Sequence, residues 1–243
     1  MASSFRRSSL VPVIGALALG FALVPIRSQT AAEVQNTPST PYEAALQHYH
    51  TGKYQDARAE IDTAEKANPG DLAIETLKAR ILTEQGDFTG GEKILRSLLT
   101  PSGPLEVQMT LGDLFLRKRD FTAAAKQYDI CLQAKPGDPD LMLKMVYAHI
   151  GSNDLPEAEK IASKLKPLDP THPSYYFARA ALAQTTGDST TADQDIENAH
   201  TIYGVIIVNR YLKTYLEVLA NPKKSPAAPG ATNAAPSGAA SQP

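Results

Sequence analysis

The sequence of 243 residues contains no tryptophan, a single cysteine and almost no excess of charge of either sign. One cysteine excludes a disulfide framework and any multi-cysteine zinc or iron–sulfur site built by this chain alone. The 24 Lys and Arg against 26 Asp and Glu give a formal charge of −2. Proteins that coat nucleic acid carry a strong basic excess, so this balance argues against that class. Hydrophobic residues make up 42% of the chain, which is enough to form a core.

The first 32 residues have the layout of an export signal. A pair of arginines precedes Leu10 to Ile26, a run without any charged side chain, and small residues follow just before Glu33. We predict a cleaved signal peptide over residues 1–32, followed by a linker over 33–40. The alternative is an uncleaved membrane anchor, because the apolar run is near the shortest length that spans a bilayer. Either alternative predicts an exported protein that is periplasmic or secreted, or held at the membrane by this segment alone.

The other end of the chain has the composition of a disordered tail. Residues 221–243 are mostly Ala, Pro, Gly and Ser, and they include no large apolar side chain. Such a segment cannot offset the entropy lost on ordering. We predict that it does not fold.

A regular pattern occupies the middle of the chain. It consists of short turns, Gly52-Lys53-Tyr54, Gly86-Asp87-Phe88, Arg119-Asp120-Phe121, Asn153-Asp154-Leu155 and Gly187-Asp188-Ser189. Their first residues stand 33 or 34 positions apart, and each turn separates two stretches with helical apolar spacing. Proline-containing stop signals follow the first four, at Asn68-Pro69-Gly70-Asp71, Pro101-Ser102-Gly103-Pro104, Lys135-Pro136-Gly137-Asp138 and Asp169-Pro170. The repeating unit is therefore predicted to be a helix, a tight turn, a second helix and a proline-marked turn.

The third unit shows how such a pair would pack. Leu111 and Phe115 lie four residues apart on one helix face. Gly112 is small where the paired helix would cross closely. Ala124, Tyr128 and Cys131 then form a stripe on the second helix that faces the first. We therefore predict that Cys131 is a buried packing residue.

This unit resembles the tetratricopeptide repeat, whose pattern is Trp-x2-Leu-Gly-x2-Tyr, Ala-x3-Phe and Pro at a period of 34 residues. Its clearest departure is Gln108 at the Trp position, and the other four units match less closely. The resemblance implies an all-α, right-handed α-solenoid of about five helix-turn-helix repeats over residues 41–203. The regular period points independently to a solenoid of helix pairs.

One further helix is predicted over residues 204–220. Its apolar stripe consists of Val205, Val208, Leu212, Leu216 and Leu219. A solenoid leaves the apolar face of its last pair bare, so we interpret this segment as a capping helix. The alternative is a docking helix for a partner, which the additional apolar residues Ile206, Ile207 and Tyr211 favour.

No pattern in the sequence is typical of a catalytic or metal-binding site. There is no His-Glu-x-x-His motif, no Gly-x-Ser-x-Gly elbow and no phosphate-binding loop with its lysine. The acidic residues Asp193, Asp195 and Glu197 lack the glycine turn and distal glutamate of a calcium loop. We interpret them as a solvated helix face. The prediction is a non-catalytic protein without a cofactor or a bound metal.

The resemblance also implies that the first helix of each unit lines a concave groove. The candidate partner-binding residues there are Tyr42, Tyr49, Arg80, Lys144 and Tyr147. Tyrosine with arginine is typical of the most important contacts in protein interfaces, although several of these side chains could instead pack between neighbouring helices. We predict a protein–protein interaction scaffold in a bacterial-type cell envelope that binds a protein or peptide segment, with assembly of an envelope complex as one role. The alternative is a glycan- or cell-wall-binding accessory to an exported enzyme.

Overall fold

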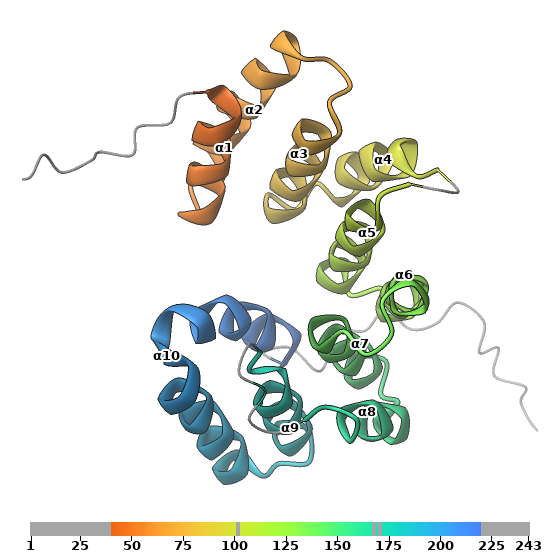
Figure 1. The fold of residues 1–243 in the computed structure, drawn as a ribbon, viewed down its shortest axis with the longest axis vertical. Coiled ribbons are helices and arrows are strands. Elements are labelled where there is room, and N and C mark those ends of the chain that lie inside the picture. The colour runs from red at the N-terminus through yellow and green to blue at the C-terminus, as the bar shows by residue number, and fades with distance from the viewer. Residues whose placement is uncertain (1–39, 101–102, 167–168, 170–171, 220–243) are drawn as a thin grey trace, which may run out of the picture. The chain divides into compact units, whose positions relative to one another are not determined.

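The computed structural model describes residues 40–100, 103–166, 169 and 172–219. These residues form ten helices and no strand: α1 Pro41–His50, α2 Tyr54–Ala67, α3 Leu72–Glu84, α4 Phe88–Leu98, α5 Leu105–Lys118, α6 Phe121–Ala134, α7 Pro139–Gly151, α8 Leu155–Ala162, α9 Ser174–Thr185 and α10 Ser189–Leu219. Consecutive helices pack against each other in pairs (Figure 1). The prediction of an all-α array of about five helix pairs is confirmed. The predicted signal or anchor segment, the linker up to residue 39 and the Ala/Pro-rich tail lie outside the described residues.

The turn inside each pair explains the recurring Gly-Asp pattern. Gly86 adopts a φ of 84°, a left-handed conformation that glycine reaches without strain. The following Asp87 caps α4, because its side chain accepts a hydrogen bond from the backbone N–H of Gly90 at 2.9 Å. Asp120 and Asp154 cap α6 and α8 in the same way. The pattern therefore reverses the chain and starts the second helix of a pair.

The turns that precede α3 and α7 also use an aspartate cap. Asp71 accepts hydrogen bonds from the backbone of Ala73 and Ile74 at the start of α3. Asp138 does so for α7 two helix pairs later, with Asp140 and Leu141 as the donors. These caps begin α3 and α7 at equivalent positions after their turns.

Packing within the third pair follows the predicted stripes. The predicted Leu111, Phe115, Tyr128 and Cys131 are all buried. A methyl group added to Gly112 would lie only 2.5 Å from Cε1 of Tyr128, so α5 and α6 cross too closely for a larger residue there. Burial raises the pKa of the Cys131 thiol to about 11. The prediction of a buried, structural cysteine is confirmed.

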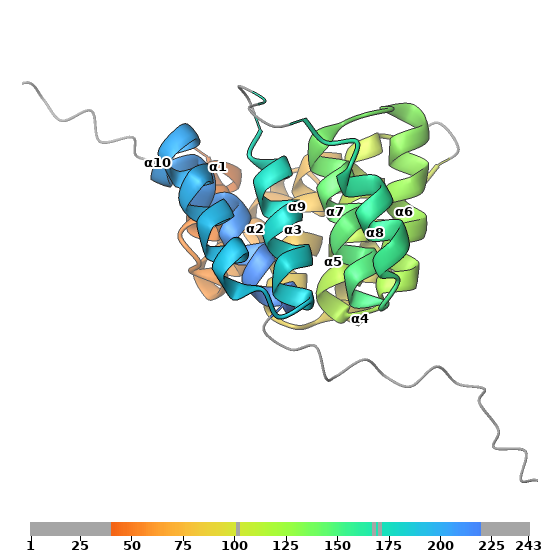
Figure 2. The ribbon, with the colours of Figure 1, turned by 90° about the horizontal axis from the view of Figure 1, so that it is seen from below.

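The last helix consists of two parts joined by a sharp kink. Gly204 has φ 76° and ψ 163°, a conformation that is essentially restricted to glycine. The first part, residues 189–203, is the second helix of the fifth pair. We call residues 205–219 the returning helix, because it comes back toward helices of earlier pairs (Figures 1 and 2). It packs on α9, as a cap would, and α10 also contacts α7 and α5.

The buried apolar residues form two separate clusters. The N-terminal cluster contains residues of α1, α2 and one face of α3, namely Ala45, Ala57, Ile61, Ala64, Ile74, Leu77 and Ile81. The larger C-terminal cluster begins at Ala79 of α3 and extends through α4–α9 to Val208, Tyr215 and Val218 of the returning helix. The returning helix is thus a part of the second core.

Candidate interaction surface

The first helices of successive pairs lie on the inner side of the arc in Figure 1, and α2, α4, α6 and α8 lie on its outer side. We call the side formed by α1, α3, α5 and α7 the inner surface. All five candidate residues predicted from the sequence lie on these helices, two on α1, one on α3 and two on α7. The structure places them in four different environments.

Tyr42 and Tyr49 pack against the N-terminal cluster and remain partly exposed. The Tyr49 ring is 5.9 Å from the ring of Tyr54 on α2. Burial, with a smaller contribution from the nearby Glu84 carboxylate, raises the pKa of Tyr49 to about 12. Both residues therefore offer aromatic surface, and that of Tyr49 lies near an acidic group.

Arg80 on α3 reaches across to α5. Its Nη2 atom lies 3.0 Å from Oε1 of Glu106 and 3.2 Å from the hydroxyl of Thr110. The side chain retains 36% of its exposure, and Glu106 retains 65%. An ion pair this exposed contributes little to stability, so the guanidinium is available to a further anionic or aromatic group.

Lys144 on α7 is held more firmly. Its Nζ lies 2.7 Å from Oδ1 of Asp113 on α5 and 5.9 Å from the ring centre of Tyr128. The Tyr128 hydroxyl donates a second hydrogen bond to Asp113 at 2.8 Å. This network joins α5, α6 and α7, which gives Lys144 a structural role in addition to its place on the inner surface.

Tyr147 differs from the other four because it is only 1% exposed. Burial raises its pKa well above the usual range, with smaller contributions from Tyr215 and Tyr211 of the returning helix. In this structure Tyr147 therefore offers no free surface to a partner. The sequence-based expectation of an accessible residue did not account for a helix that comes back over α7.

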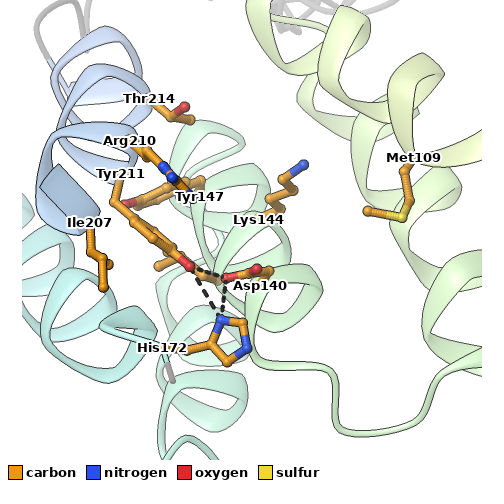
Figure 3. Close-up of a pocket in the computed structure, with 10 residues that line it drawn as sticks. Met109, Asp140, Lys144, Tyr147, His172, Ile207, Arg210, Tyr211 and Thr214 are labelled. Atoms are coloured by element: carbon orange, nitrogen blue, oxygen red, sulfur yellow. Dashed lines mark hydrogen bonds and ion pairs between the residues drawn. The ribbon is translucent and has the colours of Figure 1, made fainter. Parts of the chain in front are cut away.

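A pocket of about 470 Å³ remains between the inner surface and the returning helix (Figure 3). It is lined by Met109, Asp140, Leu143, Lys144, Tyr147, His172, Ile207, Arg210, Tyr211 and Thr214. At its edge the Tyr211 hydroxyl donates to Asp140 at 2.6 Å, and Nδ1 of His172 lies 3.3 Å from both groups. The pocket brings together Lys144 and Tyr147 of the candidate set.

Charged contacts that sequence reasoning missed connect the returning helix to α3 and α5. Lys213 donates to Glu84 at 2.8 Å and to the Tyr54 hydroxyl at 2.9 Å. Arg117 lies 2.6 Å from Glu217 and 3.2 Å from Glu84. Glu84 and Arg117 stand 33 positions apart, and so occupy equivalent places in two neighbouring repeats. The equivalent positions of Glu84 and Arg117, together with the spacing of four between Lys213 and Glu217, are the sequence pattern from which these charged contacts can be recognised.

The acidic residues on the first part of α10 do not form one site. Asp195 is 2% exposed, contrary to the expected solvated face, and pairs with Arg179 at 3.3 Å. Asp193 and Glu197 are exposed. Within the part of the chain that the structure describes, no group of three or more His, Cys, Asp or Glu residues is arranged to hold a metal ion. In the same part of the chain, no helix combines the length and apolarity needed to span a bilayer.

Two models of the tetratricopeptide repeat match residues 42–105 and 115–184. A curated relative, the putative cellulose synthase operon protein C of Escherichia coli O157:H7, is 30% identical over 179 residues, which is 68% of this chain. The chain spans only 15% of the length of that relative.

Two solved structures are similar in fold. A thermophilic tetratricopeptide-repeat protein of Thermus thermophilus has a TM-score of 0.59 at 20% identity, covering 72% of this chain and 97% of that one. A tetratricopeptide-repeat protein of Parabacteroides merdae has a TM-score of 0.58 at 12% identity, covering 72% and 70%. At these identities the likeness shows the fold alone.

Proposed function

The chain belongs to the tetratricopeptide-repeat family, and on that premise we propose that it binds a segment of a partner protein along the inner surface. Repeats of this kind indicate a protein-interaction scaffold, since stacked helix pairs create an extended surface for binding. The observation that carries the proposal is the partly exposed set Tyr42, Tyr49 and Arg80 on α1 and α3. Aromatic and arginine side chains provide much of the binding energy in protein interfaces.

The proposed location is the cell envelope. The N-terminal 32 residues have the composition of an export signal, and the curated relative is named for a cellulose synthase operon. These two observations support a role beside an exported or membrane-bound assembly.

The test begins with cross-linking and mass spectrometry in the source cell to identify a partner, and continues with a binding assay on the purified pair. Tyr42→Ala combined with Arg80→Ala should weaken binding about tenfold or more, as expected when two important contacts are lost. Lys126→Ala, which removes an exposed cation from the outer helix α6, is the matched control and should leave binding unchanged.

Both variants should keep the helical circular-dichroism signal of the parent chain. Unchanged affinity in the double variant, or cross-links that map only to α2, α4 and α6, would overturn the inner-surface proposal.

A second candidate function is glycan binding, as an accessory to an exported enzyme. It is favoured by the name of the curated relative, which refers to a polysaccharide synthase, and by the exposed faces of Tyr42 and Tyr49. Retention of the purified chain on cellulose or peptidoglycan, lost in Tyr42→Ala with Tyr49→Ala, would support this function. No retention on either polymer would eliminate it.

A further inference from the structure

The returning helix lies where a partner helix would lie. Residues 205–219 follow the kink at Gly204; α10 packs mainly on α9 and also contacts α7 and α5, and Lys213 pairs with Glu84 of α3. No side chain occupies the space beside Gly204, since a methyl group built there would meet nothing within 4 Å. The immediate surroundings of the kink are therefore open.

The apolar side of this helix binds through a small set of side chains. Val208, Tyr215 and Val218 are buried, and their spacing places them on one helix face. Tyr211 stacks on Phe177 of α9 at 5.5 Å, and Tyr215 meets the edge of the same ring at 5.8 Å. These contacts amount to one amphipathic face laid onto a preformed surface.

The polar side of the returning helix sets its position along α3 and α5. Glu84 is only 8% exposed in its side chain, and it contacts the cations of Arg117 and Lys213. Arg117 in turn binds Glu217, one helical turn after Lys213. The charges of the returning helix thus alternate against those of α3 and α5, which aligns the helix along the inner surface.

The polar contacts are open to solvent on the side of the returning helix. The side chains of Lys213 and Glu217 are 48% and 38% exposed, whereas their partners Glu84 and Arg117 are 8% and 27% exposed, so salt reaches and partly screens these ion pairs. The opposite face of the same helix exposes Val205, Ile206 and Leu216. Only one face of the helix is therefore committed to the core.

We propose that residues 205–219 are an internal ligand of the inner surface and that a partner competes with them for it. The partner is then an amphipathic helix with Val, Tyr or similar residues at the spacing of 208, 211, 215 and 218, and with a Lys followed four residues later by a Glu. This proposal rests on the proposed function and adds the chemistry of its partner and its control. A bound partner helix replaces the returning helix, which swings away at Gly204.

The experiment measures binding of a fluorescein-labelled peptide with the sequence of residues 205–219 to the full chain by fluorescence polarisation. The parent chain should bind it weakly, because its own segment fills the site. The charge-reversed chain, Lys213→Glu with Glu217→Lys, places like charges against Glu84 and Arg117. It should bind the peptide at least tenfold more tightly than the parent chain.

Two controls make the result specific. Leu216→Ala changes an exposed residue of the same helix and should bind the peptide as the parent chain does. A peptide with the Lys and Glu exchanged should bind the charge-reversed chain more weakly than the unchanged peptide does. If charge reversal lowers the helical signal, Lys213→Gln with Glu217→Gln replaces it, with an expected gain of at least threefold.

The outcomes separate this proposal from the proposed function. Equal peptide affinity in the parent and charge-reversed chains would overturn competition by the returning helix. Equal capture of the cross-linked partner by both chains would do the same, and would leave inner-surface binding intact. A third outcome is that the charge-reversed chain gains peptide binding while neither chain captures the cross-linked partner. This result would support the returning helix as an internal ligand and would contradict the proposed protein-scaffold function.

Discussion

The two ends of the repeat array bury their helices to very different degrees. In the C-terminal cluster, α7 is buried along most of its length from Leu141 to Ile150, and it packs against α6, α8, α9 and α10. In the N-terminal cluster, α1 buries Ala45 alone. Because each repeat of a solenoid contacts mainly its neighbours, stability is close to a sum of local contributions. The difference predicts an array that opens first at α1 and α2.

The same difference separates structural residues from those that are free to bind. Around α7 the returning helix covers the inner surface and buries Tyr147. Around α1 and α3 the side chains of Tyr42, Tyr49 and Arg80 remain partly exposed. Lys213 connects the returning helix to the N-terminal pairs through its hydrogen bonds to Tyr54 of α2 and Glu84 of α3. A partner that displaces this helix would therefore also loosen the N-terminal end.

The largest expected effect comes from truncating the centre of the C-terminal cluster. Phe177 is fully buried and contacts both tyrosines of the returning helix. Phe177→Ala should lower the free energy of unfolding by about 3–5 kcal/mol, the usual cost of emptying a phenylalanine site. Urea denaturation followed by circular dichroism measures the loss.

Ile130→Ala is the control for this change, because Ile130 is 48% exposed on α6. It should shift the free energy of unfolding by no more than about 0.5 kcal/mol. A Phe177→Ala chain as stable as the control would contradict a core that is concentrated at the C-terminal end.

A smaller effect is expected in the rates at which thiols in the N-terminal and C-terminal clusters react with a labelling reagent. Cys131 reports opening of the C-terminal cluster, because it is fully buried and reacts only when the surrounding helices separate. Ala64→Cys in a Cys131→Ala background places the thiol in the N-terminal cluster, where Ala64 is 3% exposed. The N-terminal thiol should be labelled by a disulfide reagent at least about tenfold faster, equivalent to about 1.4 kcal/mol in opening free energy.

Both thiols should react at the same rate in denaturing urea, because the unfolded chain removes the difference in burial. Faster labelling of Cys131 than of the N-terminal thiol in the folded chains would reverse the order of opening inferred from the two clusters.

Short sequence patterns were sufficient to predict the repeat, but they do not predict contacts between residues that are far apart in the chain. The 33- or 34-residue spacing of the turns and the stripe ending at Cys131 can be recognised from short stretches of sequence, and the structure confirms the helix pairs and the burial that they predict. Tyr147 is buried close to Tyr211 and Tyr215, more than sixty positions later in the chain. The apolar spacing of residues 205–219 predicted the helix, but a stripe does not specify which surface it meets. The kink at Gly204 decides that, and an isolated glycine in a helical pattern is compatible with several outcomes.

The smallest effect concerns the charges that join α2 to α3. Lys78 lies 3.2 Å from Asp62 and 2.5 Å from Glu65, and its side chain is 14% exposed. Burial alone would raise the pKa of Asp62, but hydrogen bonds from Arg58 and Lys78 outweigh it and lower that pKa. A carboxylate whose folded pKa is lowered contributes stability above its unfolded pKa of about 3.9, and loses it as the pH falls through the folded value.

Lys78→Met should therefore destabilise the chain at pH 6 by less than about 1 kcal/mol, since Asp62 and Glu65 are about one-third exposed. The difference between the variant and the parent chain should narrow as the pH falls below the unfolded pKa of about 3.9 and through the lowered folded pKa of Asp62. Urea midpoints at pH 6, 4 and 3 measure it. Lys160→Met, which removes an exposed partner of Glu157 within α8, is the matched control and should cost at most about 0.5 kcal/mol. If stability depended on pH to the same extent in both variants, Lys78 would contribute no stability to the contact between α2 and α3. The N-terminal end would then be stabilised by its apolar contacts and not by this ion pair.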